Sequence, residues 1–542
     1  METDPVSQEH FFGRQEILST LKKRFDAFLK GYRHNVALIG NAFTGKSSVL
    51  TQFLRQYLSD EAIAILIRLD EADSFRSFSQ KWIGGILHGY QRFRKLPAAL
   101  SPQDLINQTR RSLPVLFKKV RAIKKLVDAR QYQESYRAIL SLPYVLQQET
   151  GKKILLVIDE FDRLENFALK DPFEALGKEI MLQKDTMYIV SSSNKLRSQD
   201  IFKNKLSLLF SNFELTEVGN FSFEESENWI RSRVKNLLQD PSLCRVLIYI
   251  TNGHPYYLDV ILSRLEILSA AGNGKEIGLD ALIRALKSEL FFDRGTLHQH
   301  FFMKLSFLSK NRPSTSSDVL LAIALGKKKI ISIAGFLNKS SEEVKKILQR
   351  LIQDGIVQKS GSFFDISDLL FRFWLAEVYY RKRASLGFDY SADRLNCRKS
   401  LSSFIELIIQ EDKKDLTLRI EELFKRFRNE VVELEAAKVK CPRFTEVIAK
   451  PSNGRMFPVL AKNQNTSWLC QVVKERLEEE DVHLFLNDAG QLDDAVHKRL
   501  MIVLQGTDLN AKLLAQEAKV QLWNLNDLNL LLDLYGNPKV IL

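Results

Sequence analysis

The sequence is poor in cysteine, glycine and proline, and it contains no long apolar segment. Its cysteines are widely separated and form no C-x-x-C pair, so neither a disulfide framework nor a zinc site is expected. The 24 glycines and 13 prolines are dispersed, so no long flexible linker is expected. The longest purely apolar runs, such as Ile154–Ile158, are far below the roughly 20 residues that cross a bilayer. The four cysteines are Cys244, Cys397, Cys441 and Cys470.

The first residues, Met1–Pro5, are polar and acidic, and no apolar stretch of the signal-peptide kind follows them. Together with the scattered cysteines, this favours a cytoplasmic protein in a reducing compartment, with no membrane partner.

In contrast, the chain is rich in aromatic residues and carries a large net positive charge. The 35 Phe, 14 Tyr and 5 Trp residues exclude intrinsic disorder as the main state. A length of 542 residues predicts three or four domains, at roughly 100–200 residues per domain. The net charge of +13 indicates either polyanionic partners or a general solubility surface, and composition does not separate these alternatives.

A phosphate-binding loop is the strongest motif in the chain. The apolar run Asn35–Ile39 predicts a buried parallel strand, and G-x-x-x-x-G-K-S follows it directly at Gly40–Ser47, before a helical pattern. Backbone N–H groups at the start of such a helix face a bound anion. Lys46 can reach the β- and γ-phosphates, and Ser47 can ligate Mg²⁺. The motif therefore predicts binding of ATP or ADP with Mg²⁺, through Gly40, Asn41, Thr44, Gly45, Lys46, Ser47 and Ser48.

An acidic pair is expected at the end of a second buried strand. The apolar segment Lys153–Ile158 leads directly into Asp159 and Glu160. We expect Asp159 to hold Mg²⁺, directly or through water, and Glu160 to polarise the attacking water as general base. A strand that ends in acids is common, but together with the phosphate loop it predicts an ATPase.

Polar residues also follow a third predicted strand, Met187–Val190. Ser192 is the candidate sensor of the γ-phosphate and Asn194 the second choice; a serine-capped turn is the alternative. Arg197 is either a phosphate contact, in the same or a neighbouring subunit, or a solvated arginine, and the second is favoured.

Three motifs carry a resemblance to a known family. They are the N-terminal stretch around Phe12-Gly13-Arg14, the segment Asp159–Leu164, and Gly253–Leu258 with its G-H-P-x-x-L pattern. This set resembles the archaeal-type ATPase family, AAA+-like P-loop NTPases of the STAND clade, over roughly the first 380 residues. One departure is Gln15, where the family often has Glu.

The resemblance implies roles for residues outside the phosphate loop. It places Phe12, Gly13 and Arg14 near adenine or ribose, and it brings His254 and Pro255 to the nucleotide from a helical lid. It also implies a switch that hydrolyses ATP slowly.

The chain is thus expected to be a multidomain α/β protein. More than one βα unit separates Lys46 from Asp159, which predicts a helical insertion at about residues 90–148. Basic side chains in it form either a solvated helix face or a surface for DNA or a partner: Arg110, Arg111, Lys118, Lys119, Arg121, Lys124, Lys125 and Arg130. The expected domains are a P-loop core with a parallel sheet (1–217), a helical lid (218–292), a winged helix (293–390) and a nuclease-like α/β domain (391–542).

A winged helix is predicted from helices at 330–337 and 342–354 and a two-stranded wing at 355–358 and 361–364. Ser340 and Glu343 fit a capping box for the second helix. Such a module either contacts double-stranded DNA or only packs against the lid. Lysines that would favour phosphate contacts are Lys327–Lys329, Lys339, Lys345, Lys346 and Lys359.

The C-terminal region is predicted to be helical from about 400 to 437 and then to alternate strands and helices. The order resembles the restriction-endonuclease-like domain found in part of the same family. Such nucleases need D…[DE]-x-K over a hairpin. Here 457–461 contains no Asp, and Val472 stands two residues before Lys474. We therefore expect a degenerate nuclease fold without cleavage activity.

The leading interpretation is a STAND-type molecular switch that binds and slowly hydrolyses ATP and couples nucleotide state to DNA or partner binding, including self-association. One alternative is a DNA-binding regulator or defence module that uses ATP as a structural ligand. Another is an AAA+ origin-type initiator.

Overall fold

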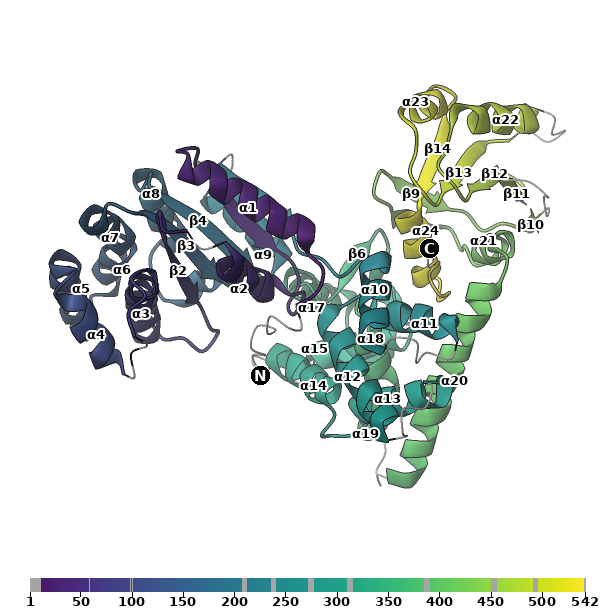
Figure 1. Ribbon diagram of the computed structural model, residues 1–542. Helices are drawn as coiled ribbons and strands as arrows, with labels where there is room; N and C mark the ends of the chain where they lie inside the picture. The colour runs from purple at the N-terminus through teal and green to yellow at the C-terminus, as the bar shows by residue number, and fades with distance from the viewer. Residues whose placement is uncertain are drawn as a thin grey trace. The chain divides into compact units, whose positions relative to one another are not determined.

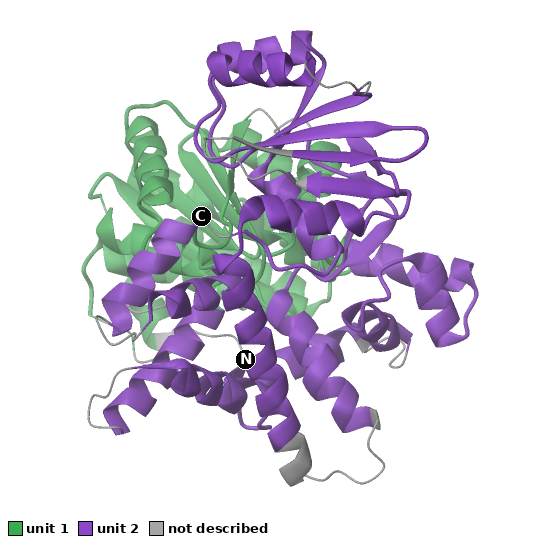
Figure 2. Ribbon diagram, turned by 90° about the vertical axis from the view of Figure 1, so that its right-hand side faces the viewer, with its two compact units in different colours: residues 1–221, 254–256, 353–355 green, residues 222–253, 257–352, 356–542 purple. Residues whose placement is uncertain are grey.

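The computed structural model describes residues 11–57, 59–97, 99, 101–206, 212–234, 240–271, 277–309, 315–384, 390–449, 456–490 and 496–540. Two compact units make up the chain (Figure 2). Unit 1 contains residues 1–221, 254–256 and 353–355, and unit 2 contains the remainder. In the described part of the chain, no helix has the length and apolar character needed to span a membrane.

Unit 1 is built on a five-stranded sheet in the order β2-β3-β4-β1-β5; β2, β3 and β4 are labelled in Figure 1. All neighbouring strands are parallel. The central strands are nearly all apolar and buried, as expected for a parallel sheet covered on both faces. The strands are β1 (Asn35–Ile39), β2 (Ala62–Arg68), β3 (Lys153–Asp159), β4 (Thr186–Ser192) and β5 (Phe213–Glu217).

Helices cover both faces of this sheet. Successive side chains of a strand point to opposite faces. Ile154, Leu156 and Ile158 of β3 therefore join the core that includes α3 (Phe75–Phe93). Leu155 and Val157 join the opposite core, with α1 (Gln15–Leu29) and α2 (Lys46–Gln56). The result is a three-layer α/β arrangement, as the sequence predicts for a P-loop core.

Between β2 and β3 the chain is helical, where the insertion was predicted. After α3 follow α4 (Pro102–Arg110), α5 (Pro114–Asp128), α6 (Tyr132–Leu140) and α7 (Leu142–Thr150). Their apolar faces share the core of α3, so these helices are an integral layer of unit 1. The remaining helices of unit 1 are the 3-10 helix Phe161–Asn166, α8 (Pro172–Leu182), α9 (Lys195–Asp200) and the π-helical turn Ile201–Lys205.

The first part of unit 2 is helical and then forms a short hairpin. The hairpin strands β6 (Gln358–Ser360) and β7 (Phe363–Asp365) are antiparallel and begin later than the predicted wing strands. Gly355 has a φ of 71°, a conformation typical of the residues that end a helix. The first strand therefore begins at Gln358 and not at the predicted residue 355. The helices are α10 (Phe223–Val234), α11 (Pro241–Thr251), α12 (Pro255–Ala271), α13 (Leu279–Leu290), α14 (Thr296–Ser309), α15 (Thr315–Ala324), α16 (Ile330–Leu337), α17 (Ser341–Gln353), α18 (Leu369–Trp374), the π-helical turn Leu375–Tyr379, α19 (Tyr380–Ala384) and α20 (Tyr390–Lys413).

The C-terminal part of unit 2 contains a second five-stranded sheet, in the order β10-β11-β12-β13-β14. Strands β10 to β12 pair antiparallel and β12 to β14 pair parallel. Its elements are α21 (Leu416–Lys425), β8 (Glu430–Glu433), β9 (Lys438–Cys441), β10 (Glu446–Ala449), β11 (Met456–Lys462), β12 (Ser467–Val473), α22 (Glu479–Gly490), β13 (Lys498–Val503), α23 (Leu509–Glu517), β14 (Val520–Asn524) and α24 (Leu525–Leu534).

The prediction of continuous helix from 400 to 437 is wrong at its end. The chain leaves α21 at Lys425 and forms the antiparallel hairpin β8–β9. Buried and exposed residues alternate along both strands, the period-two pattern of a half-buried strand. The division into four domains stays a prediction.

Hairpin β6–β7 packs closely on β8. The Ser362 N–H donates to the Val431 carbonyl oxygen (2.9 Å), and the Ser360 hydroxyl donates to the carbonyl oxygen of Glu433 (2.8 Å). Gly361 adopts a φ of 62°, and a Cβ there would overlap the Val431 carbonyl. Phe363 belongs to the core of the C-terminal sheet. The hairpin is therefore part of the packing of the C-terminal domain.

We predict that Gly361→Ala loosens this contact, because alanine is strained at positive φ and its Cβ meets the Val431 carbonyl. The expected cost is about 1–3 kcal/mol. Hydrogen–deuterium exchange of residues 430–433 and 360–364 should rise. Gly335→Ala is the matched control, since a Cβ at Gly335 meets no atom within 4 Å. Equal exchange in both variants would contradict the prediction.

Candidate nucleotide-binding site

The phosphate-binding loop connects β1 to α2. Gly40 follows β1, and a Cβ at this position would overlap the Val218 carbonyl oxygen, so the close approach requires glycine. Gly45 precedes the first helical residue with a φ of 95°. The Thr44 hydroxyl donates to the Asn41 carbonyl oxygen (2.9 Å) and closes the loop on itself. The loop thus presents the N-terminus of α2 at the carboxyl end of the sheet.

Lys46 is folded into this loop. Its side chain is buried, and Nζ donates to the carbonyl oxygens of Gly40 (3.1 Å) and Asn41 (2.7 Å). Burial lowers the pKa of the Lys46 ammonium, while the carboxylates of Glu160 and Asp159 act in the opposite direction. A phosphate oxygen would be a stronger partner than a carbonyl oxygen, because it carries formal charge.

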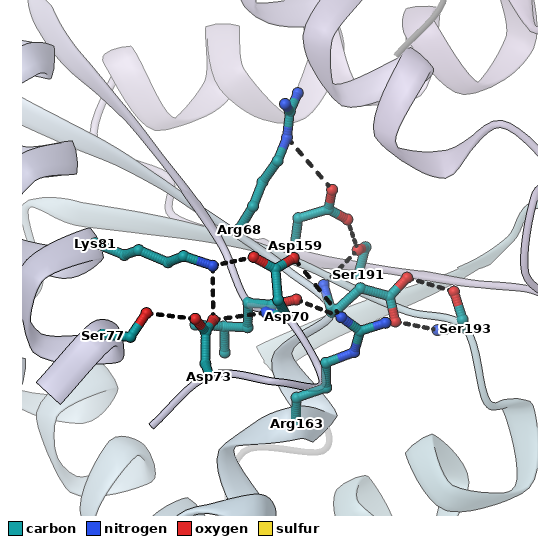
Figure 3. A network of polar contacts seen from close by, with 11 residues as sticks. Arg68, Asp70, Asp73, Ser77, Lys81, Asp159, Arg163, Ser191 and Ser193 are labelled. Atoms are coloured by element: carbon teal, nitrogen blue, oxygen red, sulfur yellow. Dashed lines mark hydrogen bonds and ion pairs between the residues drawn. The ribbon is translucent and has the colours of Figure 1, made fainter. Parts of the chain in front are cut away.

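The acidic pair at the end of β3 lies near the loop that follows β1, because β4 is the one strand between β3 and β1. The Gly40 N–H donates to the Ser192 carbonyl oxygen (3.2 Å), which ties the loop to β4. Asp159 is the last residue of β3, is buried, and accepts a hydrogen bond from the Ser191 hydroxyl. Arg68 Nε, at the end of β2, lies 3.8 Å from Asp159 Oδ2 (Figure 3).

Glu160 is held by the chain that follows β4. Its backbone has a φ of 58°, and its N–H donates to Ser191 Oγ (3.1 Å). The Ser193 N–H donates to Glu160 Oε2 (3.1 Å), and the Ser193 hydroxyl donates to the other carboxylate oxygen (Figure 3). Burial raises the pKa of Glu160, and the Lys46 ammonium and the Ser193 hydroxyl oppose that rise.

The predicted sensor residues make backbone contacts. Ser192 lies inside β4, is fully buried, and its hydroxyl accepts the Asn194 N–H (3.2 Å). The Asn194 side chain caps α9 by accepting the Arg197 N–H (3.0 Å). The strand extends two residues beyond the predicted Val190, so Ser191 and Ser193 are the serines that contact the acids. The γ-phosphate role of Ser192 stays a prediction.

Arg197 is engaged in ion pairs within unit 1. Its guanidinium contacts Glu165 at 2.8 Å and Asp162 at 3.9 Å. Glu165 also pairs with Lys205. The guanidinium is therefore held by carboxylates of its own chain.

A second polar group surrounds the turn after β2. Lys81 on α3 binds both Asp70 and Asp73, and Arg163 donates to the Leu69 carbonyl oxygen (2.7 Å). Asp70 Oδ1 lies 4.0 Å from the Arg163 guanidinium (Figure 3). Residues after β2 are thereby tied both to α3 and to the turn that carries Glu160. Sequence reasoning missed this group, because these charges follow no recognisable spacing.

The N-terminal motif braces the phosphate loop. Gly13 and Arg14 both have positive φ, and the Arg14 guanidinium donates to the carbonyl oxygens of Thr44 (3.2 Å) and Gly219. The guanidinium also lies 4.5 Å from the ring centre of Phe221, which Phe12 contacts edge-on. The structure thus gives Arg14 a direct contact with the loop, while the adenine or ribose contacts remain a prediction. His10, at the start of this motif, lies outside the described residues.

The G-H-P segment contributes to unit 1 as well. His254 Nε2 lies 3.3 Å from the Ala42 carbonyl oxygen, and the Tyr256 ring stacks on Phe43 with centroids 5.0 Å apart. Pro255 is the first residue of α12. His254 and Tyr256 therefore meet the tip of the phosphate loop.

The oxygen donors at this site fit magnesium. Mg²⁺ prefers hard oxygen ligands and retains several waters, so one carboxylate and one hydroxyl suffice beside phosphate oxygens. Asp159, the buried last residue of β3, carries such a carboxylate, and Ser47, in the first turn of α2, carries such a hydroxyl; their role as ligands stays a prediction. Among the described residues, no three His, Cys, Asp or Glu side chains form a cluster suited to a metal. His298 and His300, both on α14, are therefore not part of such a cluster.

Comparison with known proteins supports the assignment of the first domain. Residues 10–178 match the family model described as the AAA ATPase domain. No curated protein sequence matches the chain.

Solved structures are similar to this chain at low sequence identity and with TM-scores below 0.5. A Walker-type ATPase of Pyrococcus abyssi is 16% identical, with 69% of this chain and 99% of that chain covered and a TM-score of 0.48. The ORC2 protein of Aeropyrum pernix is 12% identical, with 71% and 98% covered and a TM-score of 0.42. Cdc6p of Pyrobaculum aerophilum is 12% identical, with 69% and 96% covered and a TM-score of 0.34. Scores this low transfer no residue role.

We predict that Ser193→Ala shifts the acid limb of the pH–rate profile of ATP turnover to higher pH. A general base must be deprotonated, and its activity is lost as pH falls through its pKa. The Ser193 hydroxyl lowers the pKa of Glu160, so its removal raises that pKa further. Ser193→Thr retains a hydroxyl and should keep the original limb. An unchanged limb in the alanine variant would refute the contact's influence on Glu160.

Proposed function

We propose that this chain is a STAND-type molecular switch that binds ATP with Mg²⁺ and hydrolyses it slowly. The observation that carries the proposal is the grouping of Lys46, Asp159 and Glu160 at one edge of a parallel sheet, beside a glycine-bounded loop and a helix N-terminus. This grouping supports phosphoryl chemistry, in which positioning and charge neutralisation account for most of the catalysis.

In the proposed reaction, water attacks the γ-phosphorus, the bond to the β–γ bridging oxygen breaks, and Glu160 takes the proton from the water. Lys46 neutralises the charge that develops on the phosphate oxygens. Ser47 and Asp159 would hold Mg²⁺, which would supply positive charge to offset the charge of the phosphates. The Ser193 N–H and hydroxyl each occupy one acceptor site of the Glu160 carboxylate, and the hydroxyl lowers its pKa; both make Glu160 a weaker base, which supports low turnover.

In this proposal, the nucleotide state changes the position of the winged-helix and C-terminal domains, which move together as one part of unit 2. Besides the contact between β6–β7 and β8, Arg372 on α18 binds Asp365 (2.9 Å) and Asp533 of α24 (2.6 Å). Lys328 also binds Asp365 and the Asp533 carbonyl oxygen. Such a buried network favours joint movement, because separating its members leaves charges unpaired.

The C-terminal sheet supports a binding role more than cleavage. Its central strand β12 places Gln471 and Val472 in buried positions, and neither can serve as an anionic metal ligand. We propose that this nuclease-like domain does not cut nucleic acid.

A second candidate function is a DNA-binding regulator, and a specific feature of unit 1 favours it. The segment 110–130 contains eight cations and a single acid, Asp128. Asp128 pairs with Arg76, and none of the eight cations has an ion-pair partner among the described residues. On α5, Lys118, Arg121 and Lys125 are exposed about one turn apart. The same surface would serve an AAA+ origin-type initiator, in which DNA should stimulate ATP turnover.

The switch proposal predicts that Lys46→Ala abolishes ATP binding, because the buried ammonium is lost from the loop. Glu160→Gln should retain binding and lose at least about 100-fold in turnover, since the amide cannot accept the proton. Equilibrium binding of a fluorescent ATP analogue and phosphate release measure the two effects separately. Retained nucleotide binding in Lys46→Ala would refute the proposal.

The DNA candidate predicts that Lys118→Glu/Arg121→Glu/Lys125→Glu weakens duplex binding steeply. Each lost phosphate contact should reduce the slope of log K against log salt by about 0.9, so the slope should fall by roughly 3 or more. The matched control reverses Lys22, Lys178 and Lys195, which are exposed but paired with Asp26, Glu174 and Glu217. Equal losses in both variants, or no duplex binding by the wild type at low salt, would remove the candidate.

A further inference from the structure

A groove of about 520 Å³ lies between α17, the start of α16 and the hairpin β6–β7, all within unit 2. Leu348 and Ile352 of α17 and Phe364 of β7 supply apolar surface. Lys345 of α17 and Lys359 of β6 also line it. Its volume is in the range of pockets that accept a few side chains of a ligand.

Apolar surface is exposed beside this groove. Helix α16 is almost entirely apolar, yet only Ile333 and Ala334 are buried in it. Ile331, which lines the groove, is 82% exposed, and Phe336 is 42% exposed. Apolar side chains of a partner could pack against exposed side chains such as Ile331 at the groove.

The charges of the groove are of one sign. No Asp or Glu occurs among the described residues that line it. Lys329 is paired with Glu430 (2.8 Å), whereas Lys345 and Lys359 have no ion-pair partner in the described part of the chain. An occupant that complements this surface carries carboxylates next to apolar side chains.

Two features make duplex DNA a poor occupant. A recognition helix contacts bases with its first residues. The first turn of α17 contains Glu342 and Glu343, and their negative charges repel phosphates. The Ser340 N–H and hydroxyl lower the pKa of Glu343, which keeps it ionised. In addition, the turn at Gly361-Ser362 is bonded to Val431 of β8, so the wing is already occupied.

We propose that this groove binds an acidic, amphipathic segment of a partner protein. Apolar side chains of the segment pack against Ile331, Leu348 and Ile352, and its carboxylates pair with Lys345 and Lys359. This is the mode in which an amphipathic helix or strand lies in an apolar groove.

The test is a display selection of random 12-residue peptides on the full-length protein. Recovered peptides are synthesised with a fluorophore and titrated by anisotropy against three proteins. These are the wild type, the groove variant Ile331→Glu/Lys345→Glu/Lys359→Glu, and the control Leu509→Glu/Lys512→Glu, which alters an exposed apolar and basic face of α23. ATP binding and thermal unfolding of each variant report its folding.

We expect the recovered peptides to be rich in Asp or Glu and in apolar residues. Their affinity for the groove variant should be at least tenfold lower than for the wild type, and their affinity for the control variant should be unchanged. Lys345→Arg should retain affinity, because it conserves the charge. The proposal is overturned if no recovered peptide depends on the groove, or if the dependent peptides are basic. A tenfold loss of duplex DNA affinity in the groove variant, with peptide affinity intact, would assign the groove to DNA. Conversion of a wild-type dimer to a monomer by Ile331→Glu alone would assign it to a second copy of the chain.

Discussion

The buried ammonium of Lys46 is the constraint around which the site is arranged. A cation removed from water must be compensated, and here backbone carbonyls and nearby carboxylates do so. The carbonyls can approach only because the loop is tight, which requires glycine at positions 40 and 45. The Arg14 guanidinium also stabilises the loop, because it donates a hydrogen bond to the Thr44 carbonyl oxygen. The geometry of the loop therefore suits a polyanion.

Strand β4 transmits this arrangement to the acids. Because it lies between β1 and β3, its end contacts the phosphate loop through Ser192 and both acids through Ser191 and Ser193. A serine hydroxyl can donate to a carboxylate yet release it at little cost, since each such bond is worth only about 1.5–3 kcal/mol. The same three residues therefore order the carboxyl end of the sheet through bonds that are individually weak.

Local patterns in the sequence predict most of this fold. The apolar runs of β1 and β3, the glycine-rich loop and the capping box of Ser340 and Glu343 all appear where they were predicted, because each depends on neighbouring residues. The contacts of Ser193, Arg68 and Arg163 could not be predicted, since they depend on strand order and on where β4 ends. A two-residue extension of that strand decides which serine meets Glu160.

The hairpin β6–β7 shows why a motif does not by itself define a surface. Helix, turn, helix and hairpin are local features, and the sequence predicts them. Whether the hairpin is free depends on Val431, which lies about 70 residues further along the chain. Once β8 contacts the turn, the groove between α16, α17 and the hairpin remains as an accessible surface of this module. That surface is apolar with lysines at its edges, while the acids of α17 lie at its N-terminus. For this reason we proposed an acidic protein segment, and not duplex DNA, as the occupant of this surface.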